Sequence, residues 1–182
     1  MFPEAKAAEA SRVLAERLGD LPEFSAAQRV VLYAVIPGSG ELDLRPVFNR
    51  LRASRRAALY PRCLPDGRLE FVEVPHLEAL RPGRHGIPEP GGAALSLRPE
   101  EDLVLVPGLA FDRNGVRLGR GGGYFDRTFA PGGGPSPQLF GVGYSWQLTE
   151  PLPFESHDRA MDGVVTDRET LRLRTFRSGE SH

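Results

Sequence analysis

A short glycine-rich segment carries most of the residues in this chain that could do chemistry. Residues 117–127 read RLGRGGGYFDR, with three consecutive glycines between Arg120 and Tyr124. Glycines lack the Cβ atoms that would keep a ligand away from the backbone, and arginine forks bind phosphate oxygens in pairs. Asp126 adds a carboxylate of the kind that Mg²⁺ prefers. The segment therefore predicts an anion or nucleotide site, with a structural turn as the alternative.

The spacing in this segment excludes two familiar nucleotide-binding motifs. Gly119 and Gly121 lack the third glycine of the dinucleotide-binding fingerprint, because Tyr124 stands at that position. A Walker-type loop needs a lysine after its second glycine, and Lys6 is the only lysine in the chain. Any phosphate bound here must therefore be held by arginine side chains and backbone N–H groups.

The composition limits the class of protein. The chain has 182 residues, 40% of them hydrophobic, and a formal net charge of −1, so we expect one core of ordinary size and no bulk attraction to nucleic acid or membranes. No apolar run approaches the roughly 20 residues of a membrane span, and the N-terminus lacks the layout of a secretory signal. Cys63 is the only cysteine, which excludes an intrachain disulfide. We expect a cytoplasmic protein, a monomer, with small-molecule partners.

A strand and a short helix should position the glycine-rich segment. Residues 102–107 (DLVLVP) are typical of a buried strand, and residues 124–130 (YFDRTFA) are typical of a short helix. The N–H groups at the start of that helix would point back toward the glycines, which is the geometry of an anion site. In open α/β sheets, ligands bind beyond the carboxyl ends of the strands, where this segment begins.

The rest of the pattern predicts an α/β fold: a single three-layer domain over residues 1–182, with a mostly parallel sheet and an antiparallel edge. Pro61 is expected to end its strand, and the proline- and glycine-rich residues 81–99 are expected to be irregular. Helices are expected at residues 4–18 and 44–53, and further strands at residues 29–36, 56–61, 68–74, 138–144, 163–166 and 171–176.

The segment VPGLAFDRNGVRLGRGGGYFDR, residues 106–127, resembles the signature of the 5-formyltetrahydrofolate cyclo-ligase family. Family members carry Arg-Leu-Gly-x-Gly-x-Gly-Tyr-Tyr-Asp, and Phe125 here replaces the second tyrosine. The resemblance covers most of the chain in the family's order, since it continues in YPR (60–62), GIPEP (86–90), YSWQL (144–148) and HDRAMDGVVT (157–166).

The resemblance implies an ATP- and Mg²⁺-dependent enzyme that converts 5-formyltetrahydrofolate to 5,10-methenyltetrahydrofolate and releases ADP and phosphate. The formyl oxygen is a poor leaving group, and transfer of the γ-phosphoryl group would turn it into an imino-phosphate that the folate's own N10 attacks. Two other classes stay open: a folate- or nucleotide-binding module without turnover, and a phosphosugar enzyme of similar α/β build.

The resemblance also implies roles for individual residues. Arg120 is the implied catalytic side chain, which stabilises the charge passing between the γ-phosphate and the formyl oxygen. Asp126 and Asp158 are the implied Mg²⁺ ligands, with Asp162 as a weaker third. The implied folate contacts are Glu41, Arg120, Tyr124 and Trp146, and the implied ATP contacts are Arg117, Leu118, Gly119, Arg120, Gly121, Gly122, Gly123, Tyr124 and Phe125.

Several of these residues have a structural alternative. Asp158 could cap a turn, and Glu41 could be a solvated loop residue. Tyr124, Phe125 and Trp146 could belong to the core, which is the favoured interpretation for Phe125. His157 is expected to be structural, because nothing in the implied reaction requires a general acid or base.

The opening of the chain departs from the family pattern. Family members usually begin with a basic helix whose Lys-x-x-Leu-Arg motif contacts ATP. Residues 9–18 (EASRVLAERL) resemble the family's second helix instead, and neither Lys6 nor Arg12 stands in that motif. The resemblance therefore implies that the first helix is missing. Three explanations stay open: the start of the sequence is placed too late, the glycine-rich segment holds ATP with less help, or activity is reduced.

Overall fold

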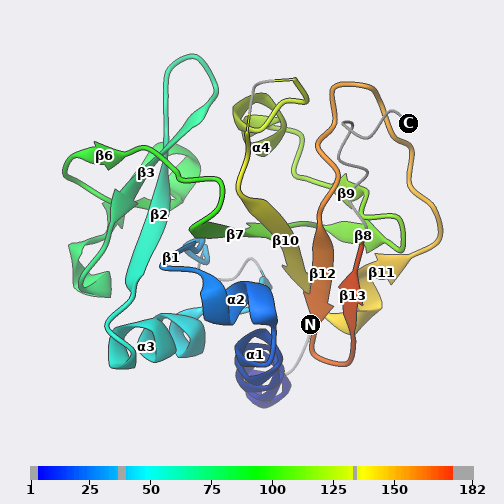
Figure 1. The fold of residues 1–182 in the computed structure, drawn as a ribbon, viewed down its shortest axis with the longest axis horizontal. Coiled ribbons are helices and arrows are strands. Elements are labelled where there is room, and N and C mark those ends of the chain that lie inside the picture. The colour runs from blue at the N-terminus through cyan, green and yellow to red at the C-terminus, as the bar shows by residue number, and fades with distance from the viewer. Residues whose placement is uncertain (1–3, 37–39, 133–134, 174–182) are drawn as a thin grey trace.

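The computed structural model describes residues 4–36, 40–132 and 135–173 (Figure 1). Within these residues the main sheet has eight strands. In spatial order they are β13 (Thr170–Arg172), β12 (Gly163–Thr166), β10 (Gln138–Gly143), β7 (Asp102–Pro107), β1 (Arg29–Val31), β2 (Ala57–Cys63), β3 (Leu69–Glu73) and β6 (Ala94–Leu95). The five strands from β12 to β2 are parallel. At one end β13 pairs antiparallel with β12, and at the other β3 pairs antiparallel with β2 and β6 pairs antiparallel with β3. The predicted α/β sheet is confirmed, with an antiparallel edge at both ends instead of one.

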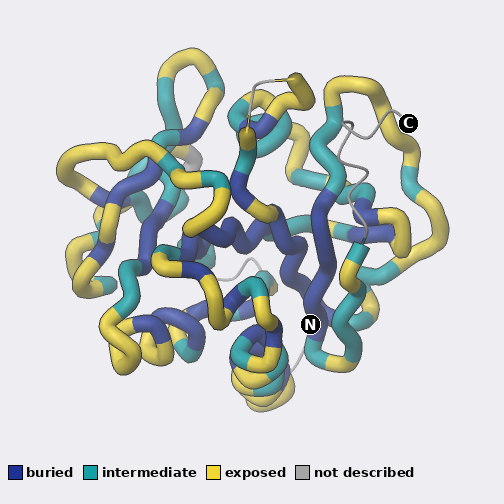
Figure 2. Tube along the Cα trace, viewed as in Figure 1, coloured by how far each residue is buried: buried dark blue, intermediate teal, exposed yellow. Residues whose placement is uncertain are grey.

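Two further layers cover the faces of this sheet. One face packs against the helices α1 (Glu4–Gly19), α2 (Pro22–Ala26) and α3 (Arg45–Ala53). The other packs against α4 (Tyr124–Thr128) and a small sheet of β11 (Leu148–Thr149), β8 (Ala110–Asp112) and β9 (Arg117–Leu118). Side chains of β7 alternate between the two cores, Leu103 and Leu105 toward the helices and Val104 and Val106 toward α4. Burial on both faces explains the continuous apolar runs, and Figure 2 shows the central strands as the buried part of the molecule.

Some local predictions were wrong. β1 ends at Val31 rather than at residue 36, and beyond it the Leu32 N–H continues the pairing by donating to the Leu59 carbonyl at 2.8 Å. Pro61 does not end β2, because beyond Leu59 this strand pairs with β3 alone, and a strand without a second neighbour tolerates proline. Residues 174–176 of the predicted last strand lie outside the described residues.

Residues 81–99 are also more regular than predicted. They contain β6, which extends the main sheet, and the two-stranded pair β4 (Arg81–Pro82) and β5 (Pro88–Glu89). Short 3₁₀ turns precede these strands at η1 (Leu77–Ala79) and between them at η2 (Arg84–Gly86). These elements have two or three residues each, so they leave no periodic pattern in the sequence.

None of the helices in the described ranges has the length and apolar character required to cross a bilayer.

The order of the strands creates a crevice at β1. From β1 the chain passes through α3 to β2 on one side, whereas β7, β10 and β12 add successively on the other side. In open α/β sheets, the carboxyl edge at such a reversal is where ligands bind. The segments that follow β1, β7 and β10 are therefore the first place to look for a site.

Candidate active site

A pocket of about 170 Å³ opens beyond the carboxyl ends of β1, β7 and β10. It has one wall from each of the three segments that follow these strands, and Arg120 closes it from the glycine loop (residues 119–123). The lining residues are Tyr33, Gly40, Glu41, Leu42, Pro107, Gly108, Leu109, Arg120, Val142, Trp146 and Gln147. The structure thus brings together Glu41, Arg120 and Trp146, three of the four residues predicted to contact folate.

Glu41 and Arg120 form an ion pair at this pocket. Nε and Nη2 of Arg120 donate to Oε1 of Glu41 at 3.3 and 3.1 Å. The Arg120 side chain keeps 50% of its surface exposed, against 16% for Glu41. Exposed ion pairs contribute only about 0–1 kcal/mol, so a substrate can replace this contact at little cost. The alternative that Glu41 is a solvated loop residue is wrong, because only 16% of its side chain is exposed.

A buried tyrosine, which was not predicted from the sequence, holds the backbone next to Glu41. The Tyr33 hydroxyl donates to the Leu42 carbonyl at 3.0 Å and thereby holds the segment that carries Glu41. Burial and, next, the nearby Glu41 carboxylate raise the pKa of Tyr33 well above its usual value. Tyr33 therefore stays neutral and keeps its donor proton. Its hydroxyl in an otherwise apolar run was the only signal in the sequence.

Trp146 forms an aromatic wall of the pocket. Its ring stacks on Tyr144, with 5.5 Å between ring centroids and 12° between the planes. Tyr144 is buried, whereas 62% of the Trp146 surface is exposed, which excludes a core role for Trp146. A supported but exposed indole is suited to stack on a flat ring.

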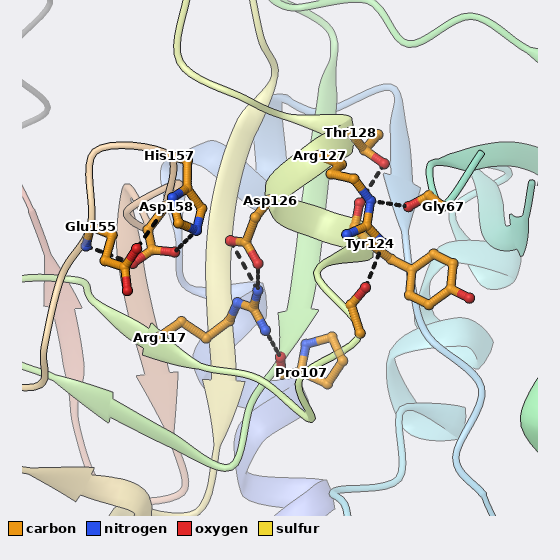
Figure 3. A network of polar contacts seen from close by, with 11 residues as sticks. Gly67, Pro107, Arg117, Tyr124, Asp126, Arg127, Thr128, Glu155, His157 and Asp158 are labelled. Atoms are coloured by element: carbon orange, nitrogen blue, oxygen red, sulfur yellow. Dashed lines mark hydrogen bonds and ion pairs between the residues drawn. The ribbon is translucent and has the colours of Figure 1, made fainter.

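The glycine loop is shaped by left-handed backbone and held by Arg127. Gly121 has φ +82° and Gly123 has φ +63°, in the region that favours glycine. Gly123 caps α4, and its carbonyl accepts the Arg127 N–H at 2.9 Å. The Arg127 guanidinium donates to the carbonyls of Gly122 and Gly67, the latter at 3.0 Å, and so fastens the loop to the turn after β2 (Figure 3).

Arg117 lies at the base of the loop and points inward. Its Nη2 donates to the two carboxylate oxygens of Asp126 at 3.2 and 3.0 Å, and its Nη1 lies 3.5 Å from the Pro107 carbonyl (Figure 3). Only 7% of the Arg117 side chain is exposed. Arg117 thus connects β9, the end of β7 and α4. Its predicted contact with ATP stays a prediction, since the guanidinium already has these partners.

The other predicted ATP contacts differ in exposure. Phe125 packs against Phe129 with 6.4 Å between ring centroids and belongs partly to the core, as its alternative supposed. Tyr124 is half-buried, with the Arg127 guanidinium 5.4 Å from its ring centroid. Leu118 is 51% exposed beside the loop. Tyr124 and Phe125 both pack against the same core and are partly buried, so Leu118 is the most accessible of the three.

The predicted magnesium ligands do not converge. Asp126 turns toward Arg117, whereas Asp158 turns toward Glu155 and His157 (Figure 3). Asp158 accepts the Glu155 N–H at 2.8 Å, so it caps its own turn. Asp162 is buried and accepts the Leu139 N–H at 2.8 Å, which is a structural role.

No cluster of three or more His, Cys, Asp or Glu side chains suited to a metal ion occurs in the described part of the chain. Mg²⁺ typically takes one or two carboxylates and fills its other positions with water and substrate phosphate. Asp126 fits that donor set, because a carboxylate that accepts two hydrogen bonds from Arg117 retains further lone pairs.

Comparisons with known proteins identify relatives of this chain. A sequence profile of the 5-formyltetrahydrofolate cyclo-ligase family matches residues 1–167, which include the pocket and the glycine loop. The chain is 32% identical over 164 residues to the 5-formyltetrahydrofolate cyclo-ligase of Escherichia coli strain K12, covering 87% of this chain and 88% of that protein. The solved 5,10-methenyltetrahydrofolate synthetase of Aquifex aeolicus is similar, with a TM-score of 0.78, 34% identity, and coverage of 100% of this chain and 90% of that chain. The synthetase of Mycoplasma pneumoniae shares the fold, with a TM-score of 0.68 and 20% identity over 92% of this chain and 90% of that chain.

Proposed function

The chain belongs to the 5-formyltetrahydrofolate cyclo-ligase family, and we propose that it carries out the family's reaction with ATP and Mg²⁺ at the pocket beyond β1, β7 and β10. The conversion is that of 5-formyltetrahydrofolate to 5,10-methenyltetrahydrofolate. The observation that carries the proposal is the meeting of Glu41, Arg120 and Trp146, from three distant segments, in one pocket at the switch point of the sheet.

The pocket suits the pterin part of a reduced folate. A pterin presents N–H donors along one edge, and the Glu41 carboxylate is the acceptor available to them. Trp146 offers a flat apolar face, and Leu109 adds a second apolar wall that is 46% exposed. A few placed polar groups in a mainly apolar pocket are typical of small-molecule sites.

Arg120 belongs to the glycine loop and also lines the pocket, so it is placed to serve both substrates. In the proposed reaction the formyl oxygen attacks the γ-phosphorus and ADP leaves. N10 then attacks the formyl carbon, loses its proton, and phosphate leaves. Arg120 stabilises negative charge on the transferring phosphoryl group. A pterin bound at Glu41 competes for the Arg120 contact and releases the guanidinium toward the phosphate.

The glycine loop is proposed to hold the ATP phosphates through its backbone N–H groups. Asp126 is the proposed carboxylate ligand of Mg²⁺, and Asp158, engaged in its own turn, is a weaker second. A bound Mg²⁺ would supply positive charge that offsets the charge developing on the phosphates. Arg117 keeps Asp126 in place, since it donates to both of its oxygens.

Incubation with 5-formyltetrahydrofolate and MgATP tests the proposal. We expect the absorbance of the methenyl product to appear together with stoichiometric ADP, and to disappear when EDTA removes Mg²⁺. Folate binding in calorimetry without any methenyl product would favour the binding module instead. Product formed without ATP would contradict the phosphorylated intermediate.

A further inference from the structure

The side-chain amide of Gln147 connects two walls of the pocket. Its Nε2 donates to the carbonyls of Gly108 and Leu109 at 2.8 and 3.1 Å. Its Oε1 accepts the Tyr144 N–H at 2.7 Å. Gly108 and Leu109 follow β7, whereas Tyr144 follows β10 and precedes the 3₁₀ turn η3 (Ser145–Gln147). One amide therefore fastens together the carboxyl ends of two neighbouring strands.

The surrounding backbone leaves room for this amide. A Cβ atom at Gly143 would lie 2.7 Å from Oε1 of Gln147 and 3.1 Å from the ring of Phe111. Real Cβ atoms essentially never approach to 2.7 Å, so a side chain at this position would displace the amide oxygen from the Tyr144 N–H. The Gln147 amide therefore packs directly against the last residue of β10 in the main sheet.

The two walls that the amide joins carry exposed apolar side chains. Leu109 is itself one of the acceptor residues, and its side chain is 46% exposed. Trp146 directly precedes Gln147 and stacks on Tyr144, whose N–H the amide binds. The three hydrogen bonds of Gln147 therefore link the two segments that carry Leu109 and Trp146, beyond the last paired residues of β7 and β10.

We infer that Gln147 is a positioning residue that sets the width of the folate pocket and thereby the affinity for the ring of the reduced folate. It acts through Leu109 and Trp146 and takes no part in phosphoryl transfer. This inference rests on the proposed function, because it assumes that the pocket between these two walls is where the folate ring binds.

Two substitutions separate the hydrogen bonds of Gln147 from its volume. Gln147→Glu keeps the shape but places a carboxylate oxygen against the carbonyls of Gly108 and Leu109, so two acceptors face each other without a proton. Gln147→Met keeps the length and removes all three hydrogen bonds. Gln138→Glu, at an exposed glutamine that begins β10, is the matched control for the added charge.

Steady-state kinetics and the emission of Trp146, the only tryptophan in the chain, measure the effect. For Gln147→Glu we expect about a tenfold higher KM for 5-formyltetrahydrofolate, as orphaned polar groups typically cause. The KM for ATP and kcat should stay within about twofold. The Trp146 emission maximum should shift in the ligand-free protein, and Gln147→Met should behave similarly with a smaller rise in KM. Gln138→Glu should match the unmodified protein in every measurement.

Two results would overturn the inference: an unchanged KM for folate in both variants, or a fall in kcat with no change in KM. Thermal melting shows whether Gln147→Glu is folded, and Gln147→Met decides the question if it is not. Folate titration followed by Trp146 emission needs no turnover. If the unmodified protein forms no methenyl product but binds folate, and both variants bind it more weakly, the proposed reaction fails while the role of Gln147 stands.

Discussion

The base and the middle of the glycine-rich segment use the same residue type in opposite ways. At the base, Arg117 is 7% exposed and its guanidinium donates to Asp126 inside the fold. Three positions later, Arg120 is 50% exposed and reaches across to Glu41, 79 positions away in the chain. The first arginine holds the segment in place, whereas the second remains available to substrates.

The two ion pairs differ in what their loss should change. Removing one partner of a buried pair leaves an uncompensated charge and lowers stability, whereas an exposed pair contributes little. Stability should therefore depend on Arg117, and turnover on Arg120. The difference shows that two arginines of one motif need separate assignments.

The largest effect is expected for Arg120→Ala. Loss of a charge-stabilising donor typically lowers kcat about 10²–10³-fold, and we expect that range in the methenyl-forming assay. The melting temperature should not change measurably, because the side chain is half exposed. Arg113→Ala removes another exposed, ion-paired arginine and is the control that should retain full activity. Turnover within about twofold of normal in Arg120→Ala would refute the catalytic role.

Arg117→Met should act chiefly on stability. Asp126 keeps 22% of its side chain exposed, so the penalty should fall below that of a fully buried pair, to about 2 kcal/mol in the free energy of unfolding. For a chain of this length that corresponds to a melting temperature lower by about 4–8 °C. Arg117→Met/Asp126→Leu should recover part of the loss, because it removes the unpaired carboxylate. Normal melting of the single variant would mean that Arg117 does not anchor the loop.

Gly123→Ala tests the backbone that follows Arg120 and leads into α4. The left-handed φ of +63° costs an alanine about 1–2 kcal/mol, and its Cβ would lie 2.6 Å from Nη1 of Arg127, which has to move. Gly121→Ala shares the left-handed φ of +82° but meets no atom within 4 Å, so the loss should be smaller. Gly91→Ala, at an open position without positive φ, is the control. Urea unfolding should rank the three variants in this order, and equal midpoints would contradict it.

Trp146→Ala extends the comparison to the pocket wall. Loss of an aromatic contact of about 1 kcal/mol should raise the KM for folate about fivefold and leave the melting temperature unchanged, since Trp146 is 62% exposed. Trp146→Phe should restore most of the affinity. A change in the KM for ATP alone would show that Trp146 contacts ATP and not the folate.

The smallest effect is expected for the alkylation rate of Cys63, which reports locally on the segment around Tyr124. Burial and, next, the Glu89 carboxylate raise the pKa of the Cys63 thiol to about 11, while a hydrogen bond with Tyr124 counteracts them. The thiol is therefore almost fully protonated at pH 8, and alkylation by iodoacetamide should rise about tenfold per pH unit up to pH 10. Glu89→Gln should lower the pKa and speed labelling at pH 8.

The same labelling distinguishes the two arginines. Arg117→Met should loosen the segment that carries Tyr124 and so reduce the burial of Cys63. Because burial is the largest cause of the raised pKa, alkylation should become faster even though the Tyr124 hydrogen bond, which lowers the pKa, is weakened. Arg120→Ala should leave the rate unchanged. Equal alkylation rates in both variants would contradict the view that Arg117 holds the segment in place while Arg120 does not.

The fold was predictable where buried strands produce a long apolar run in the sequence. β7 matches its predicted range, and β10 and β12 match to within one residue, because strands buried on both faces are continuously apolar. The helix α2 and the small sheet of β11, β8 and β9 were missed, because they contain only two to five residues each. The prediction that Pro61 ends its strand was wrong because a proline is tolerated there only if β1 stops before it. The end of β1 cannot be predicted from the residues around Pro61.

The sequence predicted which residue types form the candidate site, but not which of them hold the segment in place and which face the pocket. The glycines at positions 121 and 123 do adopt the left-handed backbone that only glycine accepts readily. Gln147 stood in the sequence as one polar residue after a strand, and nothing local indicated that its amide binds the end of β7.

The sequence by itself determined the α/β class, the buried strands, the glycine loop and the absence of lysine chemistry, because periodicity and residue type act over short range. Only the tertiary structure decided that Arg117 is an anchor, that Arg120 meets Glu41, and that Gln147 joins two pocket walls. These contacts link residues that lie up to 79 positions apart, or they depend on which side chain is buried. Burial and pairing arise only when the sheet brings the carboxyl ends of its strands together, so no local pattern contains them.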